Sequence, residues 1–478
     1  MNGNQFSRRQ MLHTSTGGVA SLALSWLLQQ EARGSVKPNL ERPHFDLLPK
    51  KPHHTPQAKA MISLFMQGGP SHMDLLDPKP ALDKLDGKPF PGKIKYDNAA
   101  QASSKVMASP WKFKKHGKCG TEVSELLPHL AKIVDDITVV RSMHTGVNNH
   151  GQSIYALLNG RIVAGNPVLG SWLCYALGCE TQNLPAFIAL PDPASLPVCG
   201  TDHWSNGWLP SLYQGTVVRA KEPRILNLDP PPAIAGGTQK QLLNFIDQLN
   251  QNHLAQRPGE HDLEARIASY ELAARMQVSA REALDLTQET KQTQSMYGMD
   301  NPASKDFGAR CLIARRLIER GVRFVQVMTR NQFWDHHGSI RTSLPRSCEV
   351  IDQPSAALVT DLKQRGLLDS TLVAWGGEMG RLPVIQNDAG PAKAGRDHNT
   401  YGFSYWLAGG GIKRGYVHGA TDEFGHHAVE DVVTHHDFHR TLMYLFGLDA
   451  EKVSFKRNTR ELNILDGQAA KIVEKLLA

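Results

Sequence analysis

Three features that would each assign this 478-residue chain to a familiar class are absent from its sequence. No patch of basic residues interleaved with aromatic ones stands out, and the net charge of +7 is spread along the chain. The sequence therefore does not predict nucleic-acid binding. The six cysteines form no C-x-x-C pair, which argues against a structural zinc site built on cysteine. No apolar run has the length of a membrane-spanning helix, so none is expected in the mature protein.

The composition is that of an ordinary globular protein. Hydrophobic residues make up 41% and charged residues 21% of a chain long enough for one large domain or two ordinary ones. Histidine is the exception: the chain has 21, and nine of them lie between His336 and His439. Histidine ligates metals and transfers protons, so this region is the first place to look for chemistry.

The N-terminus reads as an export signal. The twin-arginine sequence from Ser7 to Leu12 precedes a mildly apolar run from Val19 to Leu28, too short to span a bilayer as a mature helix. We expect a twin-arginine signal over residues 1–35, cleaved between Glu31 and Ser35, although no clean A-x-A site is visible and uncleaved anchoring stays open. A Pro- and Lys-rich linker over 36–58 and a main domain over 59–478 would follow. The expected location is periplasmic or extracellular.

An oxidising destination permits disulfides, but the sequence does not choose between pairings. We expect a few buried thiols and at most one or two bridges among Cys119, Cys174, Cys179, Cys199, Cys311 and Cys348.

Apolar runs alternate with helical patterns through most of the chain, which is typical of an α/β fold with a largely parallel sheet. The expected strands are Ala60 to Met66, Ile137 to Arg141, Phe187 to Leu190, Val322 to Met328, Leu372 to Trp375 and Phe403 to Ala408. The main expected helices are Thr121 to Ile133, Gly170 to Leu177, Phe307 to Arg320, Ser355 to Arg365 and Arg440 to Phe446. A helical insertion over about 239–300 is expected to cover the sheet and to carry no chemistry.

The stretch from Thr371 to Gly411 organises the rest of the chain. The strand ending at Trp375 leaves through two glycines into Glu378 and Arg381, and His398 follows in a GRDHN segment. A second apolar run then ends in three glycines, which we interpret as another functional strand exit. Ligands of open α/β sheets bind beyond the carboxyl ends of the strands, so this stretch is a candidate active-site rim.

Another strand exit carries Asp335 and His337, in the sequence WDHHG. Carboxylate and imidazole together suit zinc or a similar transition metal better than calcium. Because Asp335, His337, Glu378 and His398 all follow predicted strand exits, we expect them to converge at one sheet edge.

A third histidine group, THHDFH, begins the last predicted helix. Asp437 could cap that helix or take part in catalysis, and His435 or His436 could reach the site from the cap. The pair His426 and His427 is interpreted as ordinary surface histidines.

At these residues the chain resembles the DUF1501 family, which is frequently exported by planctomycete-type bacteria and has no assigned function. The motifs that carry the resemblance are GGPSHMDLLDPKP, NHGQ with LLNGR, WDHHG, DSTLVAWGGEMGR, GRDHNTYGFSYWLAGGGIKRG and ATDEFGHHAVE. The resemblance implies the fold of the alkaline phosphatase-like superfamily, a largely parallel sheet between layers of helices. It also implies that Asp335, His337 and His398 hold one divalent ion, with zinc expected, that Glu378 holds a second, and that Asp437 matches the acid near the end of sulfatases.

The chain also departs from the superfamily pattern. Gln67 stands where relatives carry an aspartate, so Asp74 or His72 must substitute as a metal ligand or one metal is absent. No cysteine lies in a C-x-P-x-R motif, so sulfatase chemistry based on formylglycine is unsupported. Counting back from Gly160 places His150 at the position of the nucleophile. His150 is therefore a candidate nucleophile, with metal ligation or a simple hydrogen bond in the loop as alternatives.

The sequence favours a metal-dependent hydrolase of phosphate or sulfate esters, with one or two divalent ions and with Arg381 binding the anionic group. Its substrate would be a small-molecule or polysaccharide anionic ester. The alternative is a non-catalytic exported protein that keeps the fold and binds a sulfated polysaccharide or a partner protein. The loss of an aspartate at Gln67 favours the alternative, and the retained Asp, His and Glu residues favour the hydrolase.

Overall fold

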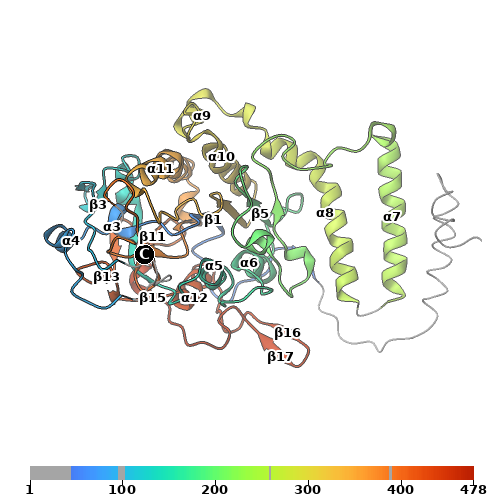
Figure 1. The fold of residues 1–478 in the computed structure, drawn as a ribbon. Coiled ribbons are helices and arrows are strands. Elements are labelled where there is room, and N and C mark those ends of the chain that lie inside the picture. Colours follow the sequence, from blue (N-terminus) through green and yellow to red (C-terminus); the bar gives the residue numbers. More distant parts are fainter. Residues whose placement is uncertain (1–44, 95–102, 258–259, 387–389) are drawn as a thin grey trace, which may run out of the picture. The chain divides into compact units, whose positions relative to one another are not determined.

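The computed structural model describes residues 45–94, 103–257, 260–386 and 390–478 (Figure 1). The predicted signal over 1–35 and the first part of the linker, residues 36–44, lie outside the described residues, so export and cleavage stay predictions. Two compact units can be distinguished. The larger contains residues 46–229 and 271–478, and the described part of the smaller is mainly residues 230–257 and 260–270.

A central sheet of nine strands forms the core of the larger unit. Its order is β12-β4-β11-β8-β1-β7-β5-β6, and β15 pairs with β4. The strands are β1 (Ala60–Phe65), β4 (Ile137–His144), β5 (Phe187–Leu190), β6 (Thr216–Val217), β7 (Phe324–Met328), β8 (Thr371–Gly376), β11 (Phe403–Ala408), β12 (Tyr416–His418) and β15 (Val433–Thr434). Only β11 runs antiparallel to its neighbours in this sheet. The predicted α/β class with a largely parallel sheet is confirmed.

Burial on both faces explains why the central strands could be recognised as continuous apolar runs. In register, Ile62 of β1 lies between Val325 of β7 and Val373 of β8, and all three side chains are completely buried. The parallel register places the carboxyl ends of β1, β7 and β8 at one edge of the sheet. Because β11 runs the other way, its three-glycine exit lies at the opposite edge. The interpretation of that exit as part of the active-site rim is wrong.

Helices cover both faces of the sheet (Figure 1). On one side lie α10 (Lys305–Glu319) and α11 (Ile340–Gln364), which pack against each other. On the other side lie α5 (His150–Asn159), α6 (Leu169–Leu177) and α12 (His435–Leu445). The remaining short elements are α3 (His72–Leu75), α4 (Pro80–Leu85), α9 (Lys291–Met296), β9 (Gly380–Arg381), β10 (His398–Asn399), β13 (Ala420–Thr421), β14 (Ala428–Glu430), β16 (Phe455–Arg457) and β17 (Arg460–Leu462).

One predicted helix is a hairpin. Residues Thr121–Ser124 form β3, which pairs with β2 (Phe113–His116). The turn between them contains Gly117 and Gly120, both at positive φ. The carboxylate of Asp135 accepts hydrogen bonds from two backbone N–H groups of the same turn. Turn chemistry therefore overrides the pattern that resembles a helix cap.

The predicted helical insertion contains two long helices. In the smaller unit, α7 (Gly237–Ala255) has no buried residue. The second helix, α8 (His261–Leu284), begins in the smaller unit and ends in the larger. Among the described residues, no helix has both the length and the hydrophobicity needed to cross a membrane.

Candidate metal centre

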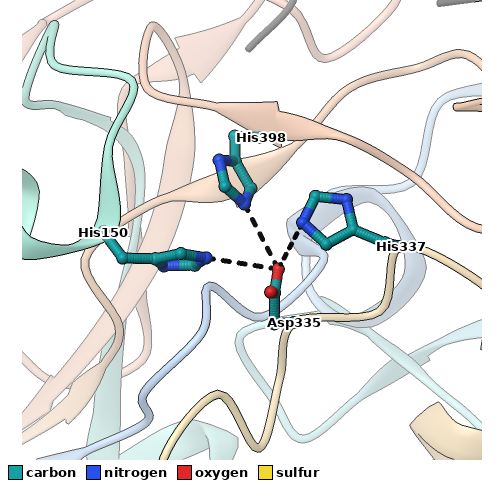
Figure 2. A group of neighbouring side chains, drawn as sticks. All are labelled: His150, Asp335, His337 and His398. Carbon is teal, nitrogen blue, oxygen red and sulfur yellow. Dashed lines mark hydrogen bonds and ion pairs between the residues drawn. The ribbon is translucent and has the colours of Figure 1, made fainter. Parts of the chain in front are cut away.

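Four side chains from three parts of the chain meet at the carboxyl edge of the sheet (Figure 2). The Nε2 atoms of His150, His337 and His398 lie 3.3, 2.9 and 3.2 Å from Oδ1 of Asp335. The four potential ligand atoms all lie within 4.8 Å of one another. Three imidazole nitrogens and a carboxylate oxygen directed at one point are a donor set that zinc and similar metals take in proteins.

The sheet topology explains this convergence. Asp335 and His337 follow β7, and His150 opens α5 a few residues after β4. Both β4 and β8 run antiparallel to β11, so β4 ends at the same edge as β1, β7 and β8. His398 lies in β10, just before β11 begins. The reversed direction of β11 therefore brings its N-terminal approach, rather than its exit, to the site.

Two glycines hold the segment that carries Asp335 and His337. A Cβ on Gly68, which has φ of +106°, would lie 2.6 Å from the backbone nitrogen of Asp335. A Cβ on Gly395 would lie 2.2 Å from the carbonyl carbon of His337. Neither gap admits a side chain, so both glycines are required for the close approach of these backbones. The ligand segment is thus held between two neighbouring loops.

The other ring nitrogens also suit metal binding. Nδ1 of His150 lies 2.6 Å from a carboxylate oxygen of Glu378, and Nδ1 of His337 is hydrogen-bonded to the side-chain oxygen of Gln386. Metal-ligating histidines usually donate the second N–H to a carboxylate, carbonyl or similar oxygen, which fixes the tautomer and turns the other nitrogen towards the metal. His150 and His337 show this arrangement, so the residues present fit a divalent cation.

The groups around Asp335 place positive charge next to its carboxylate. Burial opposes ionisation of Asp335, but Arg381 and the three histidines outweigh it and hold the pKa of that carboxyl well below its ordinary value. Burial likewise disfavours protonated His150, yet Asp335 and Glu378 raise its pKa to about 9. Burial lowers the pKa of His398, and Arg381 and His150 add to that effect. The imidazoles thus surround a carboxylate that is ionised at neutral pH.

Arg381 lies at the site but points into the protein. Its side chain is completely buried, and Nη2 lies 2.6 Å from Oδ1 of Asp335. Its other hydrogen bonds go to the backbone carbonyls of Gly68, Gly69, Trp334 and Arg396. This geometry favours a role in positioning Asp335 over the predicted contact with a substrate anion.

Glu378 supports the cluster without being one of its four members. Its carboxylate accepts a hydrogen bond from the backbone N–H of Gly68 at 2.9 Å and faces Nδ1 of His150. The sequence predicted Glu378 as the ligand of a second metal. In the structure it contacts His150, and so acts on the cluster through that imidazole.

Asp74, the fifth predicted metal ligand, is not brought to the cluster. Its carboxylate forms a completely buried pair with Arg396, at 2.8 and 3.1 Å, and accepts a hydrogen bond from Ser71. His72 does not replace it, because its Nε2 lies 2.7 Å from the carbonyl oxygen of Gly425. Both side chains are engaged in contacts with loops that are distant in the sequence.

Gln67 does not supply a ligand either, and the resemblance led us to expect an aspartate at its position. Its amide nitrogen donates to the carbonyl of Thr329, and its amide oxygen accepts from the N–H of Val198. Gln67 therefore joins the exits of β1 and β7 to the loop before Cys199. Of the two options raised by the sequence, the absence of a second metal fits this geometry better than substitution by Asp74 or His72.

Asp437 and His436 have structural partners. Thr434 caps α12, and Asp437 completes a capping box with it, which is the simpler of the two predicted roles. Nε2 of His436 lies 3.0 Å from the carbonyl oxygen of Gly160. All six cysteines are free, so the structure contains none of the disulfides that were considered.

Sequence reasoning missed the contribution of Gln386. No motif marks it, and it reaches His337 only because the chain folds back after β9. Asp397 was noted only as part of the GRDHN segment. Its carboxylate accepts a hydrogen bond from the N–H of His398 and lies 3.8 Å from Nδ1 of His337, so it steadies two predicted ligands.

Comparison with known proteins finds solved structures that are similar to this chain at low overall scores. A sulfatase from Pseudoalteromonas sp. is 12% identical over 83% of this chain and 68% of its own, with a TM-score of 0.32. An alkaline phosphatase superfamily protein from Vibrio parahaemolyticus is 11% identical over 91% of this chain and 76% of its own, with a TM-score of 0.33. Alkaline phosphatase from the Antarctic bacterium TAB5 is 9% identical over 78% and 97%, with a TM-score of 0.29. These scores are too low to transfer any feature of those proteins to this site.

No curated protein matches the sequence. The family described as "Protein of unknown function (DUF1501)" matches residues 58–477, and the chain therefore belongs to that family, as its motifs predicted.

Proposed function

We propose that the protein is a metal-dependent hydrolase of phosphate or sulfate esters. The observation that carries the proposal is the convergence of three imidazole Nε2 atoms on one carboxylate oxygen, at the sheet edge where ligands of α/β proteins bind. A purely structural role does not explain three neighbouring histidines around one acid. The rings of His150 and His398 lie only 4.2 Å apart, and those of His337 and His398 lie 4.7 Å apart.

We further propose a single ion, with zinc as the preferred metal. The four donors meet at one point, while Gln67, Asp74 and Glu378 are engaged elsewhere. When bound, the ion supplies a Lewis acid for the ester oxygen and for the attacking water. His150 then serves as a ligand rather than as the nucleophile, because its Nε2 points to the same place as the other two imidazoles and its Nδ1 is held by Glu378.

The start of α5 is suited to the anionic part of the substrate. Asn149 caps the helix by accepting a hydrogen bond from the N–H of Gln152, and His150 is the first helical residue. The positive end of the helix dipole therefore faces the site. Arg381 keeps Asp335 ionised and oriented, and Glu378 does the same for His150.

The substrate would be a small-molecule or polysaccharide anionic ester met outside the cytoplasm. Export rests on the twin-arginine sequence at Arg8 and Arg9. Replacing both with lysine should leave the protein in the cytoplasm, as fractionation would show. Unchanged export of that variant would mean that a different signal operates.

A non-catalytic binding protein remains the second candidate, and one observation favours it. Gln67 replaces an acid, and its neutral amide is built into the loop framework. A protein that binds a sulfated polysaccharide or a partner would need the framework but not a second ligand site.

Metal analysis of the purified full chain, paired with hydrolysis of aryl phosphate and aryl sulfate esters, separates the two functions. We expect about one zinc ion per chain and turnover that falls in His337→Ala. His427→Ala is the matched control, because His427 is an exposed histidine outside the cluster. Full metal content without turnover of either ester class would favour the binding protein. Absence of metal after purification and after incubation with zinc would reject both the centre and the hydrolase.

A further inference from the structure

A second polar site lies inside the larger unit, away from the four metal-binding candidates. A cavity of about 30 Å³ separates one face of the sheet from the helices α5, α6 and α12. Most of its lining is aliphatic or aromatic. Ser63 of β1, Gln326 of β7 and His203 add polar side chains to it.

The space results from small residues in one row of the sheet. Ser63 pairs in register with Gln326 on one side and with Ala374 on the other. Two of these three side chains are too short to reach the helices above them. The helices contribute larger residues, such as Leu157 and Phe438, and these do not fill the gap.

His203 and Gln326 are buried without hydrogen-bond partners among the described residues. The side chain of His203 is 0% exposed and that of Gln326 is 1% exposed. Both ring nitrogens of His203, and both the nitrogen and the oxygen of the Gln326 amide, lack a hydrogen bond to any described residue. Buried polar groups in folded proteins almost always have a partner, which is either protein or ordered water. Two side chains that line the same cavity and carry four unpaired polar atoms therefore point to a ligand in it.

The size and chemistry of the cavity identify that ligand. A cavity needs a volume of about 10–15 Å³ to hold one water molecule. The cavity beside His203 has about 30 Å³, which is room for about two water molecules. Burial lowers the pKa of His203 to about 3, which keeps its ring neutral, with one nitrogen donating and the other accepting. The Gln326 amide also offers both donors and an acceptor. No charged group lines the cavity, which argues against an ion.

We infer that this cavity is a hydration site, in which about two ordered water molecules join His203, Gln326 and Ser63. These waters connect β1, β7 and the 3₁₀ turn Gly200–Trp204, to which His203 belongs. The same three segments lead into the metal centre. Strand β1 is followed by Gln67, and β7 is followed by the loop that carries Asp335. The turn follows the loop in which the N–H of Val198 donates a hydrogen bond to the Gln67 side chain. The hydration site thus supports the scaffold behind the centre, and its existence does not depend on the proposed activity.

The sign of a stability change tests the inference. Gln326→Leu removes the amide at nearly constant volume. In a hydrated cavity the water loses partners, and the melting temperature should fall by about 1–3 °C, as for the loss of ordinary buried hydrogen bonds. In a dry cavity the same change removes unpaired polar atoms, and the melting temperature should rise. Gln182→Leu is the reference, because the Gln182 amide donates to two backbone carbonyls.

The wild-type protein provides a measurement that does not depend on the variant folding. A crystal structure of the full chain at high resolution should show about two water peaks within hydrogen-bond distance of His203 and Gln326. Crystals pressurised with xenon should show no xenon there, since xenon enters dry apolar cavities. Xenon density, an empty cavity, or a rise in melting temperature for Gln326→Leu would each overturn the inference.

Discussion

The larger unit contains two buried charged clusters in which the charged groups are paired in different ways. On α10, Arg315 is paired with Glu289 at 2.8 Å, Glu319 at 2.7 Å and Asp361 at 2.9 Å. Each of its three guanidinium nitrogens lies within ion-pair distance of a carboxylate oxygen, and Nη1 donates a hydrogen bond to Glu319. At the metal centre, one oxygen of Asp335 is approached by three imidazoles and by Arg381. The first cluster is complete within the protein, and the second gathers more donors around one atom than that atom can accept.

This difference in pairing distinguishes an ion-pair network that stabilises the fold from a cluster that binds a metal. Networks that only stabilise a fold alternate their charges, because buried like groups are costly. The metal centre instead brings His150, His337 and His398 together, a crowding that becomes favourable once a cation lies between them. The comparison predicts that breaking the Arg315 network reduces folding stability and leaves metal affinity intact, whereas breaking the centre lowers metal affinity.

Arg315→Met should have the largest effect on stability. Arg315 is 1% exposed, and its removal takes one ion-pair partner from each of the buried carboxylates of Glu289 and Asp361, which also contact Arg316 and Arg365. Removing one member of a buried ion pair costs about 3–5 kcal/mol of unfolding free energy. Denaturant titration of the wild-type protein and the variant measures the loss. Zinc content of the folded variant should not change, and a reduced content would show that the two clusters are coupled.

Asp335→Asn should have the largest effect on zinc affinity. The substitution keeps the shape of the side chain and removes the charge that the three histidines face. We expect zinc affinity to fall by more than about 100-fold, since loss of a supporting residue alone typically costs 10–100-fold. Competition with a chelator measures the affinity. A variant that binds zinc as tightly as the wild-type protein would remove Asp335 from the ligand set.

The two clusters also differ in how far the sequence predicted them. Asp335, His337 and His398 could be proposed because each follows or precedes a recognisable apolar strand, and strand ends meet at one edge. The Arg315 network was not predicted, because its members come from α10, α11 and the turn before α9, and no short motif joins them. The spacing of residues in the sequence predicts the path of the backbone. It does not report which side chains face each other across helices.

The same limit explains the errors at and around the centre. Glu378 follows a strand, as a ligand would, but its side chain is directed to His150. Asp74 also follows a strand, and is taken up by Arg396 from a distant loop. The long helix α11 was recognised only in its second half, because it contains Pro345 and Pro354, which normally mark helix ends. In each case a tertiary contact decided what local sequence left open.

Glu378→Gln sharpens the comparison by weakening the centre without removing a ligand. The amide can still accept a hydrogen bond from Gly68, but it no longer presents a carboxylate to Nδ1 of His150. We expect zinc affinity to fall about 10–100-fold, less than for Asp335→Asn. The pKa of His150 in the metal-free protein, followed by NMR titration, should also fall from its raised value of about 9. An unchanged titration would place Glu378 outside the cluster's electrostatics.

The smallest expected effect concerns buried histidines outside both clusters, which should lower the unfolding free energy in mild acid. His439 is completely buried, and Nε2 lies 2.8 Å from the carbonyl oxygen of Leu157. Burial lowers its pKa to about 4, whereas an unfolded chain has a histidine pKa of about 6.5. Between these values the unfolded state binds more protons, so the contribution of neutral His439 is complete above about pH 6.5 and is lost as the pH falls towards 4.

The matched variant is His439→Gln, which keeps a donor for the carbonyl of Leu157 but cannot titrate. Between pH 7 and 5.5 the wild-type protein should lose about 1 kcal/mol more unfolding free energy than the variant, because of this one group. Denaturant titrations at the two pH values give the difference directly. Equal losses would mean that His439 is protonated without unfolding. The buried histidines would then behave like those of the metal centre, which sit beside a carboxylate, and burial alone would no longer distinguish the two kinds of site.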